Sequence, residues 1–539
     1  MKRLITFLLI ITSVFRLAAQ DINYNIKSTE VLSDKLVERS AGLKAIGTIN
    51  EHAYFLYQPF SAIYSGATIG GKMKYYIGKF DKDVNLLKKA ELSLDQKGKN
   101  VDFEGIQIIK DKIFIFFSFQ NEAEKMHYLF SRSVNPVTLE LNDDTKMIAD
   151  LDYSGISKYK RTSVQYEVSE DESKIMFFYT VLSKNGEPLR FAVQVYDNEL
   201  NLIWRNNVSP KFEIGVFSYK QFRVDNNADV YLLGAHYTDK KNYYESANFK
   251  DKGFFSKDTY FTDVPNFTYQ LYKFSNKGAK EEYENIGLES KFIRSMSFTA
   301  YDGKVLINGV YSNPKTISAR GVFSFYYDVS TGKKTAVSSK EFSTDLIENG
   351  FSEKELNRFK RSIDDKTEYD PFDYIISNVK TLNDGSKYFT AEQFIIGTKV
   401  ENNGKQITYS TIYLYNDVFV IRLKNDNSIN NIEKISKRQY SLNTARFNSF
   451  IDFEKNGNLY FIYNTIKNKD TMFKNAEIGE TYISKVNNDV DTKVFKTPES
   501  FKVPIIIPAT QVELPNKSVM YGMMSANFKD YKFELIDVK

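Results

Sequence analysis

A polar turn that leads directly into an apolar run recurs along the chain. At residues 456–463 it reads NGNLYFIY, where Asn456 and Gly457 form the turn and Leu459–Tyr463 form the apolar run. Turn residues followed by a short run of apolar and aromatic residues are typical of a tight turn and a β-strand. Seven similar stretches begin near residues 50, 110, 171, 226, 302, 384 and 516. Repetition at spacings of 55 to 82 residues indicates a propeller or solenoid built from β units.

Each unit contains four predicted strands. A strand, a polar turn and another strand follow most copies of the motif, as in FAVQVYDNELNLIW at 191–204. The strand before each turn and the apolar run itself complete the unit, and four antiparallel strands repeated around an axis form a propeller blade. Runs such as Ile113–Phe117 do not alternate, which fits strands covered on both faces by neighbouring blades. The sequence therefore predicts an all-β fold, a β-propeller of about eight four-stranded blades, with seven as the alternative.

The two ends of the sequence complement each other. The last unit stops after YKFELIDVK, one strand short of a blade, whereas DINYNIKSTEVL near the N-terminus supplies one strand without a unit of its own. We expect residues 22–30 to pair with the last blade and to close the ring. Closure removes exposed strand edges, which promote aggregation.

The first residues predict export. Lys2 and Arg3 precede the apolar run Leu4–Phe15 and small residues at Ala18 and Ala19, as in a secretory signal peptide. The run is shorter than the roughly 20 residues that span a bilayer. We expect a signal peptide over 1–19 and a single propeller domain over 20–539. The sequence contains no cysteine, so disulfides and a cysteine-linked lipid anchor are excluded.

Insertions interrupt the regular units. Residues 236–266, rich in Lys, Tyr and Phe, lie between the second and third strands of the fourth blade. They form either a binding loop for sugars, peptides or nucleic acid or a long loop packed on the propeller rim, and their length favours the rim. Residues 58–72 are rich in glycine but lack the GxxxxGK[ST] pattern of a phosphate-binding loop, so we expect an ordinary loop.

A second large insertion, residues 344–372, contains the one clear helix. Ser352 is a good N-cap, and Glu355 three residues later completes a capping box. Phe351 and Leu356 have the spacing of a hydrophobic staple. Leu356, Phe359 and Ile363 share one helical face, so we expect this helix to dock on the propeller.

Charge and motifs exclude several classes of function. The formal net charge is +5, and removal of Lys2, Arg3 and Arg16 with the signal peptide leaves about +2, far from a strongly basic nucleic-acid-binding surface. No GxSxG elbow and no DxDxDG calcium loop is present. The three histidines, His52, His127 and His236, fall on three different blades and favour structural roles over a shared metal site. Neither a metal nor a cofactor is expected.

The most unusual polar residues lie in the sixth blade. Glu392 and Gln393 interrupt an apolar strand, and Tyr413–Asp417 are expected to precede the next strand. A buried glutamate needs a partner, and Lys437 or Arg438 is the candidate. A structural ion pair is favoured here over a ligand site. The candidate ligand-binding residues are Glu392, Gln393, Tyr415, Asp417, Lys437 and Gln439.

The same blade carries a family resemblance. The order AEQFI, YLYNDVFVIRL, IEKISKRQ and FNSFIDFEKNGNLYFIYN over residues 372–464 resembles a family of exported Bacteroidetes proteins of unknown function. Similar members carry AEQ-YY, Y-YND-I, I-K-Q and a strand that ends in Asn-Asp. Here Asn464 is followed by Thr465 instead. The resemblance implies export from a Gram-negative cell and a propeller-like fold, and it implies no reaction.

These observations favour a non-enzymatic, exported propeller that binds or scaffolds in the cell envelope. Its partner would be an envelope protein or a glycan, located in the periplasm or at the cell surface, with no nucleic acid and no transmembrane segment after signal removal. The alternative is a carbohydrate-active enzyme of the glycosidase type, with carboxylates near the central channel. A purely structural subunit is the third possibility. The catalytic residues of the enzyme alternative cannot be located, because the sequence holds 68 acidic residues.

Overall fold

The computed structural model describes residues 22–539 with the exception of sixteen segments and single residues. These are 34–41, 59–73, 95–100, 153–163, 182–189, 209–216, 238–266, 276, 302–303, 314–317, 330, 365–371, 403–406, 467–477, 498–503 and 526–529. The signal peptide predicted over 1–19, most of the insertion 236–266 and the Gly-rich residues 59–72 therefore lie outside the described residues.

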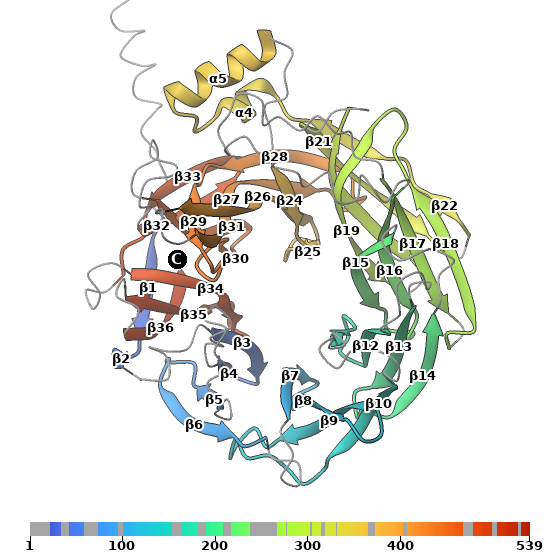
Figure 1. Cartoon of the computed structure of the whole chain (residues 1–539). Helices are drawn as coiled ribbons and strands as arrows, with labels where there is room; N and C mark the ends of the chain where they lie inside the picture. The colour runs from blue at the N-terminus through green and yellow to red at the C-terminus, as the bar shows by residue number, and fades with distance from the viewer. Residues whose placement is uncertain are drawn as a thin grey trace, which may run out of the picture.

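Eight antiparallel sheets are arranged in a ring (Figure 1). Blade 1 contains β3 (Gly42–Ile49), β4 (His52–Gln58), β5 (Tyr75–Phe80) and β6 (Leu86–Leu92). Blade 2 contains β7 (Asp102–Ile109), β8 (Lys112–Asn121), β9 (Met126–Val134) and β10 (Lys146–Asp152). Blade 3 contains β11 (Val164–Val168), β12 (Lys174–Val181), β13 (Arg190–Asp197) and β14 (Leu202–Val208). Blade 4 contains β15 (Phe217–Val224), β16 (Val230–Tyr237), β17 (Phe267–Ser275) and β18 (Lys280–Ile286).

The second half repeats this plan with additions. Blade 5 contains β19 (Phe292–Tyr301), β20 (Lys304–Ser312), β21 (Ala319–Asp328) and the short β22 (Lys333–Lys334) and β23 (Ser338–Glu341). Blade 6 contains β24 (Asp373–Ile376), β25 (Lys380–Thr381), β26 (Lys387–Asn402), β27 (Ile407–Leu423), β28 (Ile429–Ile435) and β29 (Gln439–Leu442). Blade 7 contains β30 (Ile451–Lys455), β31 (Asn458–Ile466), β32 (Ile478–Asn487) and β33 (Asp489–Val494). Eight blades are thus confirmed over seven.

Blade 8 is closed by the N-terminal strand, as predicted. It contains β34 (Pro504–Glu513), β35 (Val519–Ser525) and β36 (Asp530–Val538), and β1 (Tyr24–Ser28) forms its outer strand. β1 pairs with β36 over five residues, from Tyr24 opposite Val538 to Ser28 opposite Glu534, and β2 (Leu32–Ser33) extends the same edge. Lys493 also donates to the carbonyl oxygen of Ile22, which is buried between blades 7 and 8.

The recurrent turn and apolar run form the hairpin between the first two strands of each blade. Asn50, Asp111, Glu172, Ala228, Asn456 and Lys517 in these turns have positive φ angles, the backbone region that tight turns require. The following runs are the second strands, which are almost fully buried; β35, for example, has seven buried residues in a row. Neighbouring blades cover both faces of these strands, which explains why they do not alternate.

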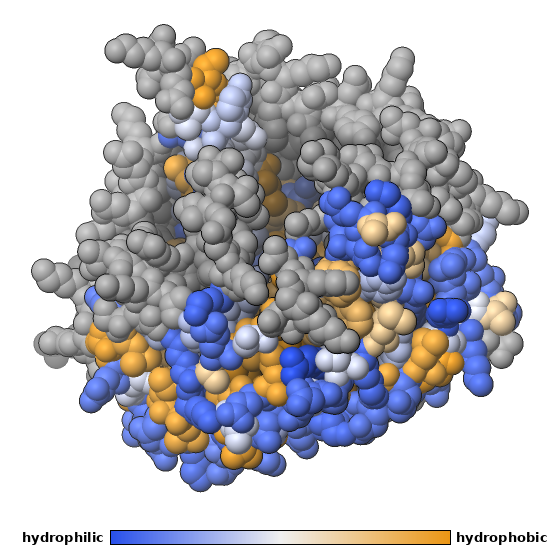
Figure 2. Space-filling view, turned by 60° about the horizontal axis from the view of Figure 1, so that its bottom comes forward, coloured by the Kyte–Doolittle hydropathy of each residue, from blue (hydrophilic) through white to orange (hydrophobic). Residues whose placement is uncertain are grey.

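The hydrophobic core consists of eight clusters, one between each pair of adjacent blades. Phe116 and Phe177 join blades 2 and 3, for example, and Phe55 and Phe533 join blades 1 and 8 across the closure. Some exposed apolar residues lie on outer strands, among them Leu87 and Leu202, and others lie on the extended β26–β27 hairpin of blade 6, among them Ile396 and Val400. Figure 2 brings the outer strands of the lower blades forward and shows a mainly hydrophilic surface with separate hydrophobic patches. Within the described part of the chain, no helix has the length and apolarity needed to cross a membrane.

The insertion between blades 5 and 6 contains two helices, α4 (Thr344–Glu348) and α5 (Glu353–Asp364), which lie outside the ring beside blade 6 (Figure 1). The sequence predicted α5 and missed the shorter α4. The capping box is confirmed, because the Glu355 amide donates to Ser352 Oγ at 3.3 Å and the Ser352 amide donates to Glu355 Oε2 at 2.8 Å. Phe359 is buried, and the side chain of Ile363 lies outside the described residues.

Candidate functional site

The polar residues of blade 6 lie on an extended hairpin. β26 and β27 pair from Lys387 opposite Leu423 to Asn402 opposite Ile407, with an irregularity between Glu392 and Phe394. Tyr413–Asp417 therefore belong to β27 itself, and the expectation that they precede the strand is wrong. The apolar run that begins at Val418 is the buried second half of β27. The first half of β27 is more exposed, so its residues lack the apolar pattern that marked the run.

The predicted ion pair of Glu392 is present, with Lys437 as its partner. Lys437 Nζ lies 2.6 Å from Glu392 Oε1. Ser449 Oγ donates to the other carboxylate oxygen at 2.8 Å, and Lys437 Nζ also donates to Gln439 Oε1 at 2.8 Å. Both charges are thus compensated inside the protein, as buried charges must be.

Asp417 forms a second buried ionic centre. Its carboxylate binds Lys434 Nζ at 2.9 Å and the Arg438 guanidinium, which also contacts Glu355 on α5 at 3.2 Å. Burial raises the pKa of Asp417, but Arg438 and Lys434 outweigh this effect and hold the pKa below its ordinary value. Lys434 further donates to the carbonyl oxygen of Ile347 at 2.7 Å. This network therefore attaches the helical insertion to blade 6.

Both the NH₂ group and the carbonyl oxygen of the Gln439 side chain form hydrogen bonds within the protein. Its Nε2 donates to the carbonyl oxygens of Ser449 and Asn464 at 2.9 and 2.8 Å, and its Oε1 accepts from the Ser449 amide at 2.7 Å. Asn464 in turn donates to the carbonyl oxygens of Phe447 and Ile506, so it joins blade 7 to blade 8. These bonds fix an irregular backbone between blades.

The structure brings five of the six candidate residues together. Tyr415 lies beside the pair, with Lys437 Nζ 5.9 Å from its ring centre. Gln393 is the exception, because its amide donates to Tyr374 at 3.2 Å. The residues that carry the family resemblance also meet here, since Glu392, Asp417, Lys437, Gln439 and Asn464 all belong to the connected region. Glu392, Asp417, Lys437 and Gln439 are all engaged by other side chains or by the backbone of the protein.

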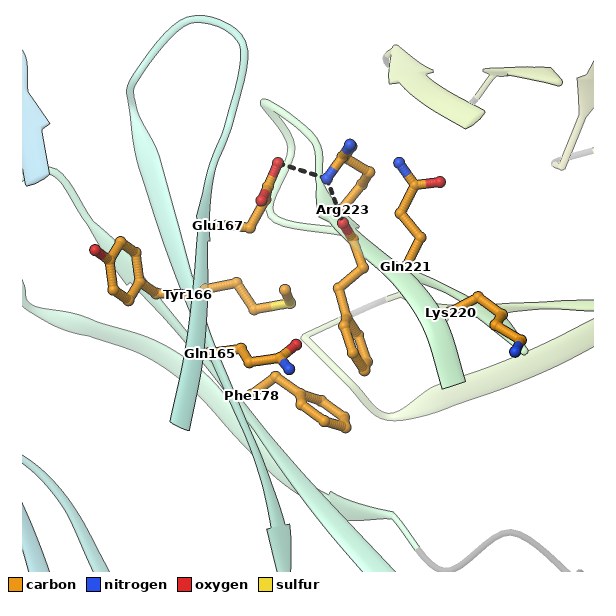
Figure 3. Close-up of a pocket in the computed structure, with 9 residues that line it drawn as sticks. Gln165, Tyr166, Glu167, Phe178, Lys220, Gln221 and Arg223 are labelled. Atoms are coloured by element: carbon orange, nitrogen blue, oxygen red, sulfur yellow. Dashed lines mark hydrogen bonds and ion pairs between the residues drawn. The ribbon is translucent and has the colours of Figure 1, made fainter. Parts of the chain in front are cut away.

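A different site lies between blades 3 and 4. A pocket of about 200 Å³ is formed by the first strands of these blades, β11 and β15, with Met176 and Phe178 from β12. Figure 3 shows Glu167 pointing toward Arg223, while Lys220 and Gln221 extend from β15 and the Tyr166 ring points away. The residues that line it are Gln165, Tyr166, Glu167, Met176, Phe178, Lys220, Gln221, Phe222 and Arg223.

Arg223 is the centre of this pocket's polar contacts. Its Nη1 lies 2.7 Å from Glu167 Oε1 and donates to the Phe222 carbonyl oxygen at 2.9 Å, and its Nη2 donates to Asn378 Oδ1 at 2.6 Å. Asn378 follows β24, so one arginine connects blades 3, 4 and 6. Burial raises the pKa of Glu167 despite Arg223, and burial lowers the pKa of Arg223 despite Glu167. Each charge is only partly compensated by the other.

Gln221 makes the neighbouring contact to blade 5. Its Oε1 accepts from the Phe298 amide at 3.1 Å and from Ser297 Oγ at 3.2 Å. The side chain therefore bridges two first strands that do not otherwise share a sheet. Sequence reasoning missed this whole pocket. The available signal was the pair of polar residues at alternate positions in each first strand, Gln165 and Glu167 in one and Gln221 and Arg223 in the other.

The structure places the three histidines on β4, β9 and β16, in blades 1, 2 and 4. Among the described residues, no group of three or more His, Cys, Asp or Glu side chains is arranged to hold a metal ion.

Comparison with known proteins bears on the fold alone. No family model matches the chain, and no curated protein matches it. Similar solved structures include the beta-propeller domain of the Trilobed protease from Pyrococcus furiosus, at 12% identity and a TM-score of 0.34, covering 85% of this chain and 97% of that one. The Pyrococcus horikoshii acylaminoacyl peptidase is 11% identical, with a TM-score of 0.35. The match covers 90% of this chain and 59% of the peptidase chain. The polysaccharide lyase Uly1 is 10% identical, with a TM-score of 0.34, and the match covers 96% of this chain and 100% of the lyase chain. At this similarity no activity follows, and the chain's own eight sheets define it as an all-β propeller.

Proposed function

We propose that this protein is an exported, non-catalytic propeller that binds a small polar ligand, or one end of a larger one, in the pocket between blades 3 and 4. The observation that carries the proposal is the lining of that pocket. Glu167 is its single carboxylate among the described residues, and that carboxylate is engaged by Arg223 at 2.7 Å.

The lining argues for binding over glycoside hydrolysis. Glycosidases generally use two carboxyl groups, about 5 to 9.5 Å apart, one as acid and one as base or nucleophile. Among the residues described as lining the pocket there is one carboxylate, so the second carboxyl group that this chemistry uses is not found in this lining. The raised pKa of Glu167 comes from burial.

The pocket has the composition of a recognition site. Two amide side chains, Gln165 and Gln221, and two cations surround an apolar floor that includes Phe178 and Phe222. Ligand sites combine such a floor with a few polar groups that orient the ligand. The volume of about 200 Å³ is below the roughly 300 to 1,000 Å³ of typical small-molecule sites, so it suits a small ligand or a terminal group.

The place of action is part of the same proposal. The basic start, apolar run and small residues over 1–19 support export, and the resemblance over 372–464 supports a place in the envelope of a Gram-negative cell. Fractionation with N-terminal sequencing tests it. We expect mature protein that begins at Gln20, in the periplasm or on the cell surface. Full-length protein in the cytoplasm would contradict it.

The binding role is tested by capture from the envelope of the protein's own cells. Tagged wild-type protein and the variants Gln165→Ala and Lys220→Ala are incubated with envelope extract, and retained glycans, metabolites and peptides are identified by mass spectrometry. Lys112→Ala is the matched control, because Lys112 is an exposed lysine beside another surface pocket. We expect one ligand to be retained by the wild type and the control and depleted about tenfold in both pocket variants.

The same extracts separate binding from catalysis. New reducing ends that appear with the wild type and disappear with Glu167→Gln would establish the carbohydrate-active enzyme instead. Equal retention by all variants would show that the pocket is not the binding site.

A further inference from the structure

We infer that the pocket between blades 3 and 4 recognises a carboxylate group, and that its ligand is an acidic sugar such as a uronic acid. This inference rests on the proposed function and specifies its ligand. It comes from the charges that line the pocket, from the unused donors of Arg223, and from the position of Lys220.

The lining carries a net positive charge. Lys220 and Arg223 are its two cations, and Glu167 is its one carboxylate. A ligand with a single negative charge would neutralise the pocket, whereas a dianion such as a phosphate monoester would leave an uncompensated negative charge beside Glu167. The charge balance therefore favours a carboxylate.

Arg223 is held in place and still has donors to offer. Its bonds to Glu167, Phe222 and Asn378 use three of the five N–H groups of the guanidinium. The remaining two are the Nε–H and one Nη2–H, and Nε makes no hydrogen bond to a described residue. Adjacent N–H groups of arginine match the two oxygens of a carboxylate. Because its partners already fix the side chain, little conformational entropy is lost when a ligand binds.

Lys220 supplies the second cation. It precedes Arg223 by three residues on β15, lines the same pocket, and forms no ion pair with a described residue. The surrounding protein desolvates the ammonium group and lowers its pKa, although the residue is exposed. Asp373 offsets this effect from blade 6, and its own carboxylate is bound by Arg294 at 3.2 Å. Two cations that line one pocket, of which Lys220 has no ion-pair partner among the described residues, favour an anionic ligand.

The side-chain amide of Gln165 is the reason to expect that the ligand is a sugar. Gln165 is exposed at the pocket and makes no side-chain hydrogen bond to a described residue, so its carbonyl and its NH₂ group are both available. Sugar hydroxyls donate and accept, and an amide can serve both roles. Phe178 and Phe222 pack on each other with ring centres 3.6 Å apart and are buried, so the polar side chains of the lining would make the main contacts with the sugar.

The test is isothermal titration calorimetry of the mature protein with sodium glucuronate, glucose and inorganic phosphate at constant ionic strength. We expect glucuronate to bind at least tenfold more tightly than glucose or phosphate. Lys220→Gln should weaken glucuronate at least tenfold and leave glucose unchanged. Lys220 is exposed, so this variant should fold; Arg223→Gln should show the same loss, and its melting temperature is recorded to exclude unfolding. Lys112→Gln is the control and should bind like the wild type.

Each contrary outcome has a definite meaning. Glucuronate that binds no better than glucose, or equally well to Lys220→Gln, overturns the inference. Phosphate that binds more tightly than glucuronate also overturns it. If glucose binds and Gln165→Ala abolishes that binding, the pocket remains a binding site and only the carboxylate is wrong. If neither sugar binds and envelope capture is independent of Lys220, both proposals fail.

Discussion

Lys437 Nζ lies 2.6 Å from Glu392 Oε1, and the two side chains are 0% and 3% exposed. Replacement of Glu392 by Gln leaves the ammonium group buried without its counter-charge. Loss of one partner of a buried pair typically costs about 3 to 5 kcal/mol. We therefore expect Glu392→Gln to lower the free energy of unfolding by an amount in this range, measured by urea denaturation.

The control for this prediction is a double-mutant cycle. Lys437→Met and the double variant Glu392→Gln/Lys437→Met complete it, and the double variant should be more stable than Glu392→Gln because it buries no unpaired charge. A Glu392→Gln protein with wild-type stability and weakened ligand binding would instead assign the pair to a ligand site.

Removal of residues 21–30 should destabilise the whole ring. The deletion removes the five-residue pairing of β1 with β36 and the packing of Tyr24 on Phe495, whose ring centres are 5.1 Å apart. It also exposes the edge of β36. We expect a sharp fall in melting temperature, measured by circular dichroism. Lys27→Ala is the control, because the ion pair of Lys27 with Asp83 is exposed and should contribute less than about 1 kcal/mol. An unchanged melting temperature of the deletion would show that β1 is not the closing element.

Acid should weaken the attachment of the helical insertion to blade 6. Burial raises the pKa of the Asp417 and Glu355 carboxyls, but Arg438 and, for Asp417, Lys434 outweigh it, so both pKa values lie below their ordinary values of 3.8 and 4.5. As the pH falls, the unfolded chain binds protons first. The stabilisation is therefore present above the unfolded pKa and is lost as the pH falls through the folded pKa.

We expect the free energy of unfolding to decline between about pH 5 and pH 3. Asp417→Asn should be less stable at neutral pH and should decline less steeply, because it lacks one of the two carboxyls. Equal slopes for the variant and the wild type, measured by denaturation at each pH, would remove Asp417 from the acid response.

Blade 5 offers a sensitive test of close packing. A Cβ at Gly309 would collide with the backbone carbonyl oxygen of Ser295 and lie 2.9 Å from Met296 Cα on the paired strand. Backbone atoms cannot move aside cheaply, so Gly309→Ala should cost at least about 1 to 3 kcal/mol. Gly287→Ala is the control, because a Cβ there meets nothing within 4 Å. Similar melting temperatures for the two variants would contradict this account.

Local signals explain why most of the fold could be predicted from the sequence. The turn at Asn456 and Gly457 requires positive φ angles, and the buried run after it lacks alternation; both are properties of a few adjacent residues. The missing strand of blade 8 follows from counting strands. The extra length of β27 was missed because Tyr413–Asp417 are polar and aromatic, a composition that does not separate a projecting strand from a loop.

Of the two candidate sites, the one in blade 6 could be predicted from the sequence and the pocket between blades 3 and 4 could not. The Glu392–Lys437 pair was predictable, because a charge within an apolar strand requires a partner and the cations Lys437 and Arg438 follow in the same blade. The Glu167–Arg223 contact joins two blades across 56 residues. Its geometry depends on how the blades are arranged in the ring, and no pattern within either strand encodes that arrangement.

The backbone amide of Lys539 donates to the carbonyl oxygen of Asn23 at 3.0 Å. The seam of the ring therefore runs through the interior of one blade, and to open it the protein must break a β-ladder as well as separate packed surfaces. A circular permutant that joins these two residues through a short linker, and that starts at Gly457 instead, would move the seam to blade 7 while every sheet keeps its strand order. Because the first and last strands are neighbours in one sheet, we expect the fold to tolerate a new pair of chain ends in another blade.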